Sequence, residues 1–461
     1  MCQGSGKDAV KVTREFAEFA AQCDFKDLPE EVVEKTKGCL LDLLGCALAG
    51  SQTETAKILL SFVRDVGGKP ESTLWKCRDV VPSFWAAFYN GTISHALELD
   101  DGHVTAHTHP GVTVIPAVIA VAESTGGNGR DLVTSIALGY ELNVRLGEAI
   151  SPSAIYSRGF HTPALVGSFS AAAAGGRMLG LDERQLANAL GIASLGPLGV
   201  METFESGAMT KDAYGGWPAA VGTLAATLAG KGFTGADTVL EGESGFCRAV
   251  SDERKVDKLL KGLGEDWRML SIYQKRHAMC SHGHTAMEAG LEILNKYSPD
   301  LNEIEKILVR TYQFAATMNQ RHPGTEVAAR FSIPYCLAVE LKKGRPVGPS
   351  DFTAAMLHSE QLYALSDKIE VVLDQEVEKF HNDHKDLRRS IVEVLMSDGR
   401  RYTSCVDVAK GWPQKAFTQE EIEAKFMVLS SGCVTTAQNV IEKISALEEQ
   451  EDVHSLIELL A

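Results

Sequence analysis

The chain has 461 residues, and its 45 Lys and Arg against 61 Asp and Glu give a formal net charge of −16 at pH 7. This length exceeds one typical hydrophobic core, so we expect two domains. The negative charge disfavours nucleic acid or an anionic membrane surface as a partner, whereas a small anionic substrate needs only a few local cations. The sequence has 10 Cys without a CxxC pair and no signal-peptide pattern, which together predict a cytoplasmic protein with reduced thiols.

The first half of the chain has the apolar periodicity of helices. Segment 29–50 is a clear example, because it opens with Pro and acids and closes in small residues. Other segments, such as 162–176, are rich in Ala and Gly, so their neighbours must approach closely to bury them. The sequence therefore predicts a compact helical domain whose further helices span 9–23, 82–96, 114–124, 129–150, 161–179, 182–195 and 218–231.

The pattern changes near residues 262–271, after which strand-like runs begin. Segment 390–405 holds two alternating stretches around the turn sequence SDGR, which predicts a β-hairpin. Residues 271–408 are predicted to form a smaller α+β domain, and the tail from residue 418 returns to a helical pattern. Within that domain we expect strands over 305–312 and 369–373 and helices over 286–296 and 330–341.

Residues 90–111 carry the densest group of titratable side chains in the chain. They are His95, Glu98, Asp100, Asp101, His103, His107 and His109. Acids beside histidines suit general acid–base catalysis, because His changes its charge near neutral pH. Two alternatives stay open: the acids cap the next helix while the histidines form ordinary loop hydrogen bonds, or His103, His107 and His109 bind a metal ion together with an Asp. The density of the group favours catalysis, and the sequence predicts an enzyme.

Three further motifs carry candidate site residues. His161 begins a small-residue helix, where the helix dipole lowers a His pKa and free N–H groups attract anions; the alternative is a simple cap. Lys211 stands among Gly and Ala, and it either binds a substrate carboxylate or is solvated. Segment 273–284 combines fixed positive charge, histidines and one thiol. The thiol either donates a proton or is a small buried apolar side chain. Its candidates are Lys275, Arg276, Cys280, His282 and His284.

Motifs along nearly the whole chain carry a family resemblance. They include LDLLGCALAGS (41–51), AAFYNGTISHALELDDGH (86–103), GFHTPALVGSFSAAAAGGRMLGLD (159–182), MTKDAYGGWPAA (209–220) and ARFSIPYCLAVEL (329–341). These patterns resemble the MmgE/PrpD family, which holds 2-methylcitrate dehydratases, cis-aconitate decarboxylases and iminodisuccinate epimerases. The resemblance implies a mainly α fold, in which a large helical domain from both chain ends (1–270 and 409–461) carries a smaller inserted α+β lid (271–408). It also implies a homodimer and an active site in the cleft between the two domains.

The resemblance also places the family's site residues on this sequence. They fall on Glu98, His109, His161, Lys211, Lys275 and Cys280, with Asp100, Asp101, His103 and His284 as neighbours in matching motifs. Three features depart from the usual pattern, one of which is segment 275–280, KRHAMC, where many members show KPYPCC. Glu98 stands where the family often has Asp, and Cys280 stands where decarboxylases of the animal type have His.

The family's reactions share one difficult step, the generation of carbanion character beside a carboxylate, which nearby cations stabilise. We expect His109 and His161 to transfer protons, while Glu98 and Asp101 orient a His or bind a substrate hydroxyl. The expected cations are Lys211, Lys275 and Arg276. The other expected substrate-binding residues are Asp100, His103, His282 and His284.

The leading interpretation is a cofactor-free hydro-lyase of the 2-methylcitrate dehydratase kind, without a metal, acting on a small di- or tricarboxylate. Inside the family the alternatives are an itaconate-forming cis-aconitate decarboxylase, because ELDDGH also resembles the fungal form, and a dicarboxylate epimerase. From another class, a metal-dependent hydrolase would use His103, His107, His109 and Asp101. No GxSxG, Rossmann or P-loop motif supports a serine nucleophile or a nucleotide cofactor.

Overall fold

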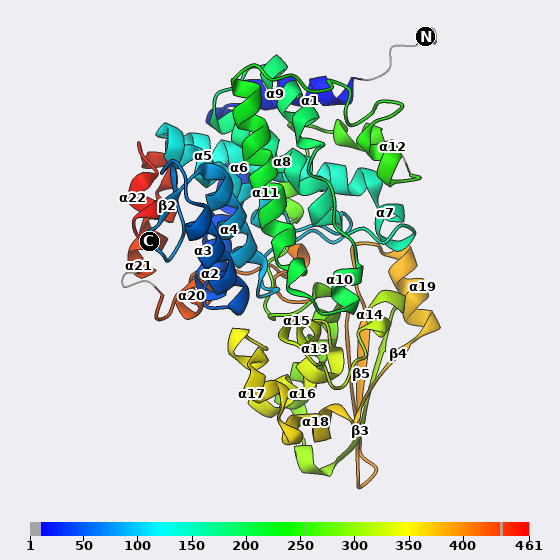
Figure 1. Ribbon diagram of the computed structural model, residues 1–461. Helices are drawn as coiled ribbons and strands as arrows, with labels where there is room; N and C mark the ends of the chain where they lie inside the picture. The colour runs from blue at the N-terminus through cyan, green and yellow to red at the C-terminus, as the bar shows by residue number, and fades with distance from the viewer. Residues whose placement is uncertain (1–10, 254, 434–436, 461) are drawn as a thin grey trace.

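The computed structural model describes residues 11–253, 255–433 and 437–460, and it is mainly helical with one small mixed sheet in the second half of the chain (Figure 1). The first half forms α1 (Val12–Gln22), α2 (Glu30–Gly50), α3 (Glu54–Val66), β1 (Ser72–Thr73), β2 (Val80–Val81), α4 (Ser83–His95), α5 (Pro110–Thr125), α6 (Gly129–Ile150), α7 (Ser153–Tyr156), α8 (Thr162–Met178), α9 (Glu183–Ala193), α10 (Glu202–Glu205), α11 (Ala213–Gly230) and α12 (Phe246–Val250). The second half forms α13 (His284–Tyr297), β3 (Ile304–Thr311), α14 (Gln313–Thr317), α15 (Glu326–Arg330), α16 (Ile333–Lys343), α17 (Ala354–Leu357), α18 (Glu360–Ser366), β4 (Ile369–Leu373), α19 (Gln375–Asp383), β5 (Ser390–Met396), β6 (Arg401–Val406), α20 (Gln419–Leu429), α21 (Ala437–Ser445) and α22 (His454–Ile457).

The helices predicted in the first half are present, and the differences lie at their ends. The predicted start of the first helix, at residues 9–10, lies outside the described residues. Helix α11 begins at Ala213 rather than at residue 218, because Pro218 lies inside the helix instead of opening it. Helix α3 was not predicted, although Thr53 caps it by accepting a hydrogen bond from the backbone N–H of Ala56.

Glycines allow α8 and α11 to pack closely, as the small-residue composition predicts. A Cβ atom on Gly222 of α11 would lie 2.3 Å from the Cβ of Ala171 on α8. A Cβ atom on Gly167 of α8 would lie 2.7 Å from the Cβ of Pro218. No real side chain fits at such distances, so the contact between these two helices depends on glycine.

The sheet has the strand order β4-β3-β5-β6, with β3 and β4 parallel and the other neighbours antiparallel. Strands β5 and β6 form the predicted hairpin around residues 397–400. Burial alternates along β5, so that Val392, Val394 and Met396 point into the core. Helix α13 packs against this hairpin and covers that face.

The described chain has two large clusters of buried apolar side chains. One spans α1 to α9 and also includes Ile422, Phe426 and Val440 of the tail helices, so α20 and α21 pack on α2 at the start of the chain (Figure 1). The other is formed mainly by residues 278–406. The predicted domain boundaries at residues 270 and 408 remain a prediction, and residues 271–408 are called the predicted lid below. Among the described residues, no helix is both long and apolar enough to cross a membrane.

Candidate active site

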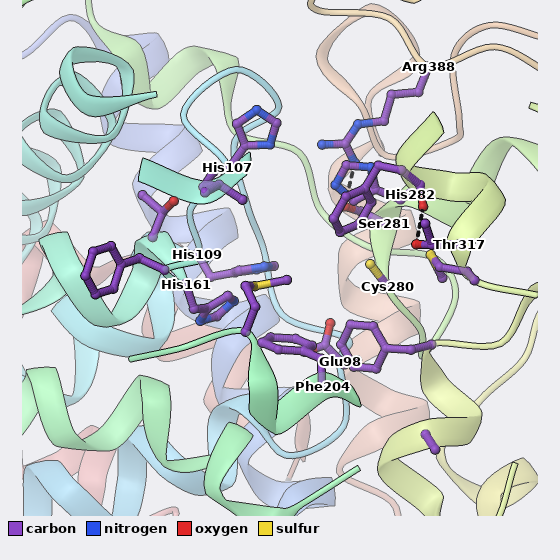
Figure 2. A pocket seen from close by; sticks show the side chains of 18 of the residues that line it. Glu98, His107, His109, His161, Phe204, Cys280, Ser281, His282, Thr317 and Arg388 are labelled. Atoms are coloured by element: carbon purple, nitrogen blue, oxygen red, sulfur yellow. Dashed lines mark hydrogen bonds between the residues drawn. The ribbon is translucent and has the colours of Figure 1, made fainter. Parts of the chain in front are cut away.

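A cavity of about 420 Å³ is lined by residues from both sequence halves. Figure 2 shows His109 and His161 on one side of it, Cys280, His282 and Arg388 on the other, and Glu98 below and between them. The first group comes from the loops before α5 and α8, and the second comes from the predicted lid. Aromatic side chains complete the wall: Phe160, Phe204, Phe314 and Phe331. The cavity therefore combines titratable groups with an apolar surface, as ligand sites commonly do.

Glu98, which lines the cavity, holds two lysines that are buried behind it. Its Oε1 contacts the Nζ of Lys211, and its Oε2 lies 3.0 Å from the Nζ of Lys275. The two lysine side chains are 1% and 0% exposed. Lys211 lies at the end of a short helical turn (Met209–Lys211) before α11, and Lys275 comes from the predicted lid. Burial lowers the pKa of Lys211 well below its usual value. The resemblance predicted that these three residues would meet, and they do.

The backbone at Glu98 is in the left-handed region, with φ of +51°. This conformation costs a residue with a side chain about 1–3 kcal/mol and persists only where its surroundings enforce it. Here it turns the chain between the end of α4 and the two aspartates that follow. It places Glu98 and Asp100 close to one imidazole: the Nε2 of His95 lies 4.0 Å from Glu98 Oε1, and its Nδ1 lies 3.2 Å from Asp100 Oδ2.

Asp100 joins two histidines to Lys275. Its Oδ2 lies 3.2 Å from the Nδ1 of His95 and 3.0 Å from the Nδ1 of His109, and its Oδ1 lies 3.9 Å from the Nζ of Lys275. Burial alone would raise the pKa of Asp100, but Lys275 and the two imidazoles hold it well below its usual value. Asp100 is therefore ionised, and it lies at ion-pair distance from the His109 imidazole.

Asp101 supports this arrangement from outside the cavity. Its backbone carbonyl lies 2.6 Å from the Nδ1 of His109. Its carboxylate accepts hydrogen bonds from the Tyr140 hydroxyl at 2.6 Å and from the backbone N–H of Gly111 at 3.1 Å. Burial raises the pKa of Asp101 to about 6. The carboxylate that contacts a histidine most closely is thus that of Asp100, whereas the sequence analysis gave this contact to Glu98 or Asp101.

His161 faces the cavity from the first position before α8, as predicted. Its ring packs near Phe204 and Tyr214, with centroid distances of 4.9 and 5.3 Å. Burial, together with nearby His95 and His109, lowers its pKa well below the usual value, so the imidazole is neutral at pH 7. The direction agrees with the expectation, but the main cause is burial rather than the helix dipole.

The predicted lid contributes a buried arginine that the sequence analysis missed. Arg388 is 2% exposed, and its Nη1 donates a 2.7 Å hydrogen bond to the Oγ of Ser281. Its guanidinium lies 5.5 Å from the Trp412 ring. Among the described residues, no carboxylate oxygen lies within 4.0 Å of it, and its buried Nε has no hydrogen-bond partner. A buried cation without an acidic partner is costly unless an anion binds there.

Two more groups of the predicted lid face the cavity beside Arg388. Burial raises the pKa of the Cys280 thiol, which therefore stays protonated at neutral pH. The Nδ1 of His282 lies 2.6 Å from the Tyr312 hydroxyl, and burial lowers the pKa of His282 well below its usual value. Both side chains are neutral at pH 7, so Arg388 supplies the positive charge on this wall.

Three predicted residues have other positions or partners. The Nη1 of Arg276 lies 3.1 Å from the Glu288 carboxylate, and Arg276 does not line the cavity. His284 is buried behind the wall, where its Nε2 lies 3.2 Å from the carbonyl of Met279. His103 lines the cavity, but its Nδ1 accepts a hydrogen bond from the backbone N–H of Ala106.

Lys425 of helix α20 binds the backbone of both the loop that contains Glu98 and the segment that contains Lys275. The Nζ of Lys425 pairs with Asp42 at 2.7 Å and donates hydrogen bonds to the carbonyls of Leu99, at 3.0 Å, and Lys275, at 2.8 Å. Although burial alone would lower it, the pKa of Lys425 is raised by Asp42. This ion pair thus positions Lys275 and the loop that follows Glu98.

The ligand set proposed for a metal-dependent hydrolase does not assemble. In the described part of the chain, three or more His, Cys, Asp or Glu ligand atoms come within 4.8 Å of one another only at His95, Glu98 and Asp100. The ammonium groups of Lys211 and Lys275 occupy the same carboxylates, and a second cation there would be repelled. These residues therefore fit an ion-pair network better than a metal centre.

Comparison with known proteins agrees with this geometry. The MmgE/PrpD N-terminal domain matches residues 14–259, and the MmgE/PrpD C-terminal domain matches residues 277–450. The chain belongs to the MmgE/PrpD family. This family member is 27% identical to a cis-aconitate decarboxylase of Aspergillus terreus, over 97% of this chain and 96% of that protein. It is also 27% identical to the human cis-aconitate decarboxylase, over 97% of this chain and 94% of that protein.

A 2-methylcitrate dehydratase of Yarrowia lipolytica is a weaker match. It is 25% identical over 87% of this chain and 79% of its own length. The MmgE/PrpD chain is therefore a lyase of this family, and its named relatives include both decarboxylases and a dehydratase.

Proposed function

We propose that this protein is a decarboxylase of the cis-aconitate type. The observation that carries the proposal is the similarity to cis-aconitate decarboxylases over 97% of the chain, against 87% for the dehydratase. This similarity favours the decarboxylase alternative over the dehydratase interpretation that led from the sequence. The substrate class is a small tricarboxylate with a double bond beside the carboxylate that leaves.

The reaction breaks one C–C bond, releases CO2 and leaves an electron pair that the neighbouring unsaturated carboxylate accepts. That carboxylate becomes more negative in the transition state, so cations aimed at it lower the barrier. Glu98 and Arg388 line the cavity, and the ammonium groups of Lys211 and Lys275 are buried against Glu98, behind the wall. We assign Arg388 to a carboxylate that stays on the substrate, because none of the described acids has a carboxylate oxygen within 4.0 Å of it.

The carbanion then takes one proton at carbon. The Nδ1 of His109 is held by Asp100 and by the carbonyl of Asp101, which leaves its Nε2 for the cavity. His161 lies 6.3 Å away, measured between ring centroids. We assign proton delivery to this pair, with the Asp101 carbonyl and Asp100 fixing the position of the His109 ring.

The departing carboxylate would face the apolar wall of Phe204 and Phe331. A carboxylate loses its charge as it becomes CO2, so an apolar surface disfavours the starting state more than the transition state. The two rings pack edge to face, with their centroids 4.8 Å apart, and both line the cavity. This half of the cavity supports loss of CO2, because CO2 needs no proton in order to leave.

Proton NMR in D2O, with cis-aconitate and 2-methylcitrate as separate substrates, tests the proposal. We expect CO2 release from cis-aconitate and one deuterium on carbon in the dicarboxylate product, with no elimination of water from 2-methylcitrate. Water elimination from 2-methylcitrate, with cis-aconitate unreacted, would instead establish the dehydratase.

The homodimer implied by the family is a further part of the proposal. Leu195 and Leu198 are 77% and 69% exposed, and Trp217 is 42% exposed. Large apolar side chains at the surface are typical of subunit contacts. Sedimentation velocity at micromolar concentration should give twice the mass of the chain, and a concentration-independent monomer would contradict this assignment.

A further inference from the structure

A second cavity, of about 330 Å³, adjoins the first. It lies between η3 (Val256–Leu259) and the loop after α19, and its wall includes Lys255, Lys258 and Lys385. His107 and Arg388 line both cavities, so these two side chains form a shared partition. Figure 2 shows them at the same end of the active-site cavity, opposite Glu98.

The second cavity is electropositive in a chain whose net charge is −16. Lys255 contacts Glu253, which reduces its contribution. Within the described residues, no carboxylate oxygen lies within 4.0 Å of the Nζ of Lys258 or Lys385. Glu148 is the acid among the lining residues, and it accepts a 2.9 Å hydrogen bond from Thr105. Excess positive charge therefore remains in this cavity.

Arg388 connects this charge to the catalytic cavity. Its Nη1 donates to Ser281, whereas its buried Nε has no hydrogen-bond partner among the residues that the structure describes. An unpartnered group of this kind, in a side chain that is 2% exposed, indicates that a ligand supplies the missing acceptor. The guanidinium can bind a carboxylate from either cavity, because it lines both.

We propose that the second cavity is an anion-binding antechamber that collects the polycarboxylate substrate and passes it along Arg388 to the catalytic cavity. The inference rests on the proposed function for the carboxylate nature of the substrate. The chain as a whole repels anions, and a basic cleft offsets this repulsion by raising the local substrate concentration and the association rate. Lys258 and Lys385 supply the long-range attraction, and Arg388 makes the first direct contact.

The test is the double variant Lys258→Gln/Lys385→Gln. Its matched control is Lys261→Gln/Lys379→Gln, which removes the same charge from exposed positions near the same elements but outside the cavity. For a trianionic substrate we expect kcat/KM of the first variant to fall about 20-fold at 10 mM salt and about threefold at 150 mM, with kcat unchanged. The control should stay within about twofold of the wild type at both salt concentrations. Equal losses in the two variants would overturn the proposal.

Two further measurements separate the possible failures. Calorimetric titration with tricarballylate, a tricarboxylate without a double bond, does not depend on turnover and so tests the cavity even if the proposed reaction is wrong. We expect weaker binding at 10 mM salt in the cavity variant than in the control, and equal affinities would refute the antechamber. Inorganic phosphate should compete with substrate; a phosphate effect that substrate cannot reverse would show a separate effector site and overturn the passage role.

Discussion

Removing the negative charge of Glu98 should destabilise the protein strongly. In Glu98→Gln, Lys211 loses its contact with Oε1 and Lys275 loses the carboxylate oxygen at 3.0 Å. Lys275 keeps Asp100 at 3.9 Å, but the described chain offers Lys211 no other carboxylate oxygen within 4.0 Å. The substitution therefore leaves one buried ammonium group without a counterion.

Two independent estimates give the expected loss in the free energy of unfolding. Removing one partner of a buried ion pair costs about 3–5 kcal/mol. Alternatively, Lys211 releases its proton in the folded protein. A lysine in the unfolded chain is charged at pH 7, and removing its proton there costs about 4.6 kcal/mol, by which the folded state is destabilised. Burial already lowers the pKa of Lys211, which makes the second route accessible. Either route predicts a loss of about 3–5 kcal/mol in the free energy of unfolding.

Equilibrium unfolding in urea at pH 7, followed by far-UV circular dichroism, measures this loss. Glu451→Gln is the matched control, because it removes one carboxylate from an exposed position and should change stability by less than about 0.5 kcal/mol. Glu98→Asp keeps the charge on a side chain one methylene shorter, and it should lose less stability than Glu98→Gln. A loss below about 1 kcal/mol in Glu98→Gln would refute the ion-pair account of the site.

Three more substitutions test the chemistry and the charges. His161→Gln should lower kcat about 10²–10⁴-fold with little change in KM, measured as CO2 release, and a kcat near that of the wild type would remove His161 from proton transfer. Arg388→Gln should raise KM about 10–100-fold, since a hydrogen bond to a charged group contributes about 1.5–3 kcal/mol; an unchanged KM would leave Arg388 without a substrate contact. Glu340→Gln should remove a contribution to stability that falls as pH rises, because burial raises the pKa of Glu340 to about 7, and Glu340, at 3.1 Å, raises that of His277 against the effect of burial. Both groups hold protons that the unfolded chain releases, so their contribution to stability falls as pH rises from 5 to 8, whereas buried neutral histidines such as His161 and His282 contribute in the opposite direction. The urea midpoint of Glu340→Gln should therefore rise relative to that of the wild type between pH 5 and pH 8, and Glu292→Gln should keep the slope of the wild type.

The helices and the β-hairpin could be predicted because their signals are local. Periodicity, capping residues and the SDGR turn act over a few residues, and the predicted ranges match α6 and β4 at both ends. The site residues Glu98, His161 and Lys211 were found through motifs, since nothing local shows that they meet. Their convergence depends on the packing of α4, α8 and α11, which the glycine contacts explain only after the fold is known.

Sequence alone does not predict which of two adjacent, identical residues faces the site. Arg388 and Arg389 are adjacent and chemically identical, yet Arg389 pairs with Asp407 at 2.7 Å near the surface, while Arg388 is buried at the cavity. Asp100 and Asp101 differ in the same way, because the left-handed backbone at Glu98 decides which carboxylate meets the histidines. One residue of register changes the side to which a side chain points, and the sequence alone does not fix that register.

The charge distribution indicates which part of the cavity would select between loss of water and loss of CO2. Lys211 and Lys275 are balanced by Glu98 and Asp100, so in the proposed reaction these buried charges behind the cavity wall would favour a carbanion without a large net charge. Loss of water and loss of CO2 both pass through such a carbanion, and this half of the site suits either reaction. The two reactions differ in the leaving group, since hydroxide must be protonated as it departs and CO2 must not. Specificity therefore depends on the wall that meets the leaving group, where an apolar surface is compatible with CO2 and gives no proton to a hydroxyl.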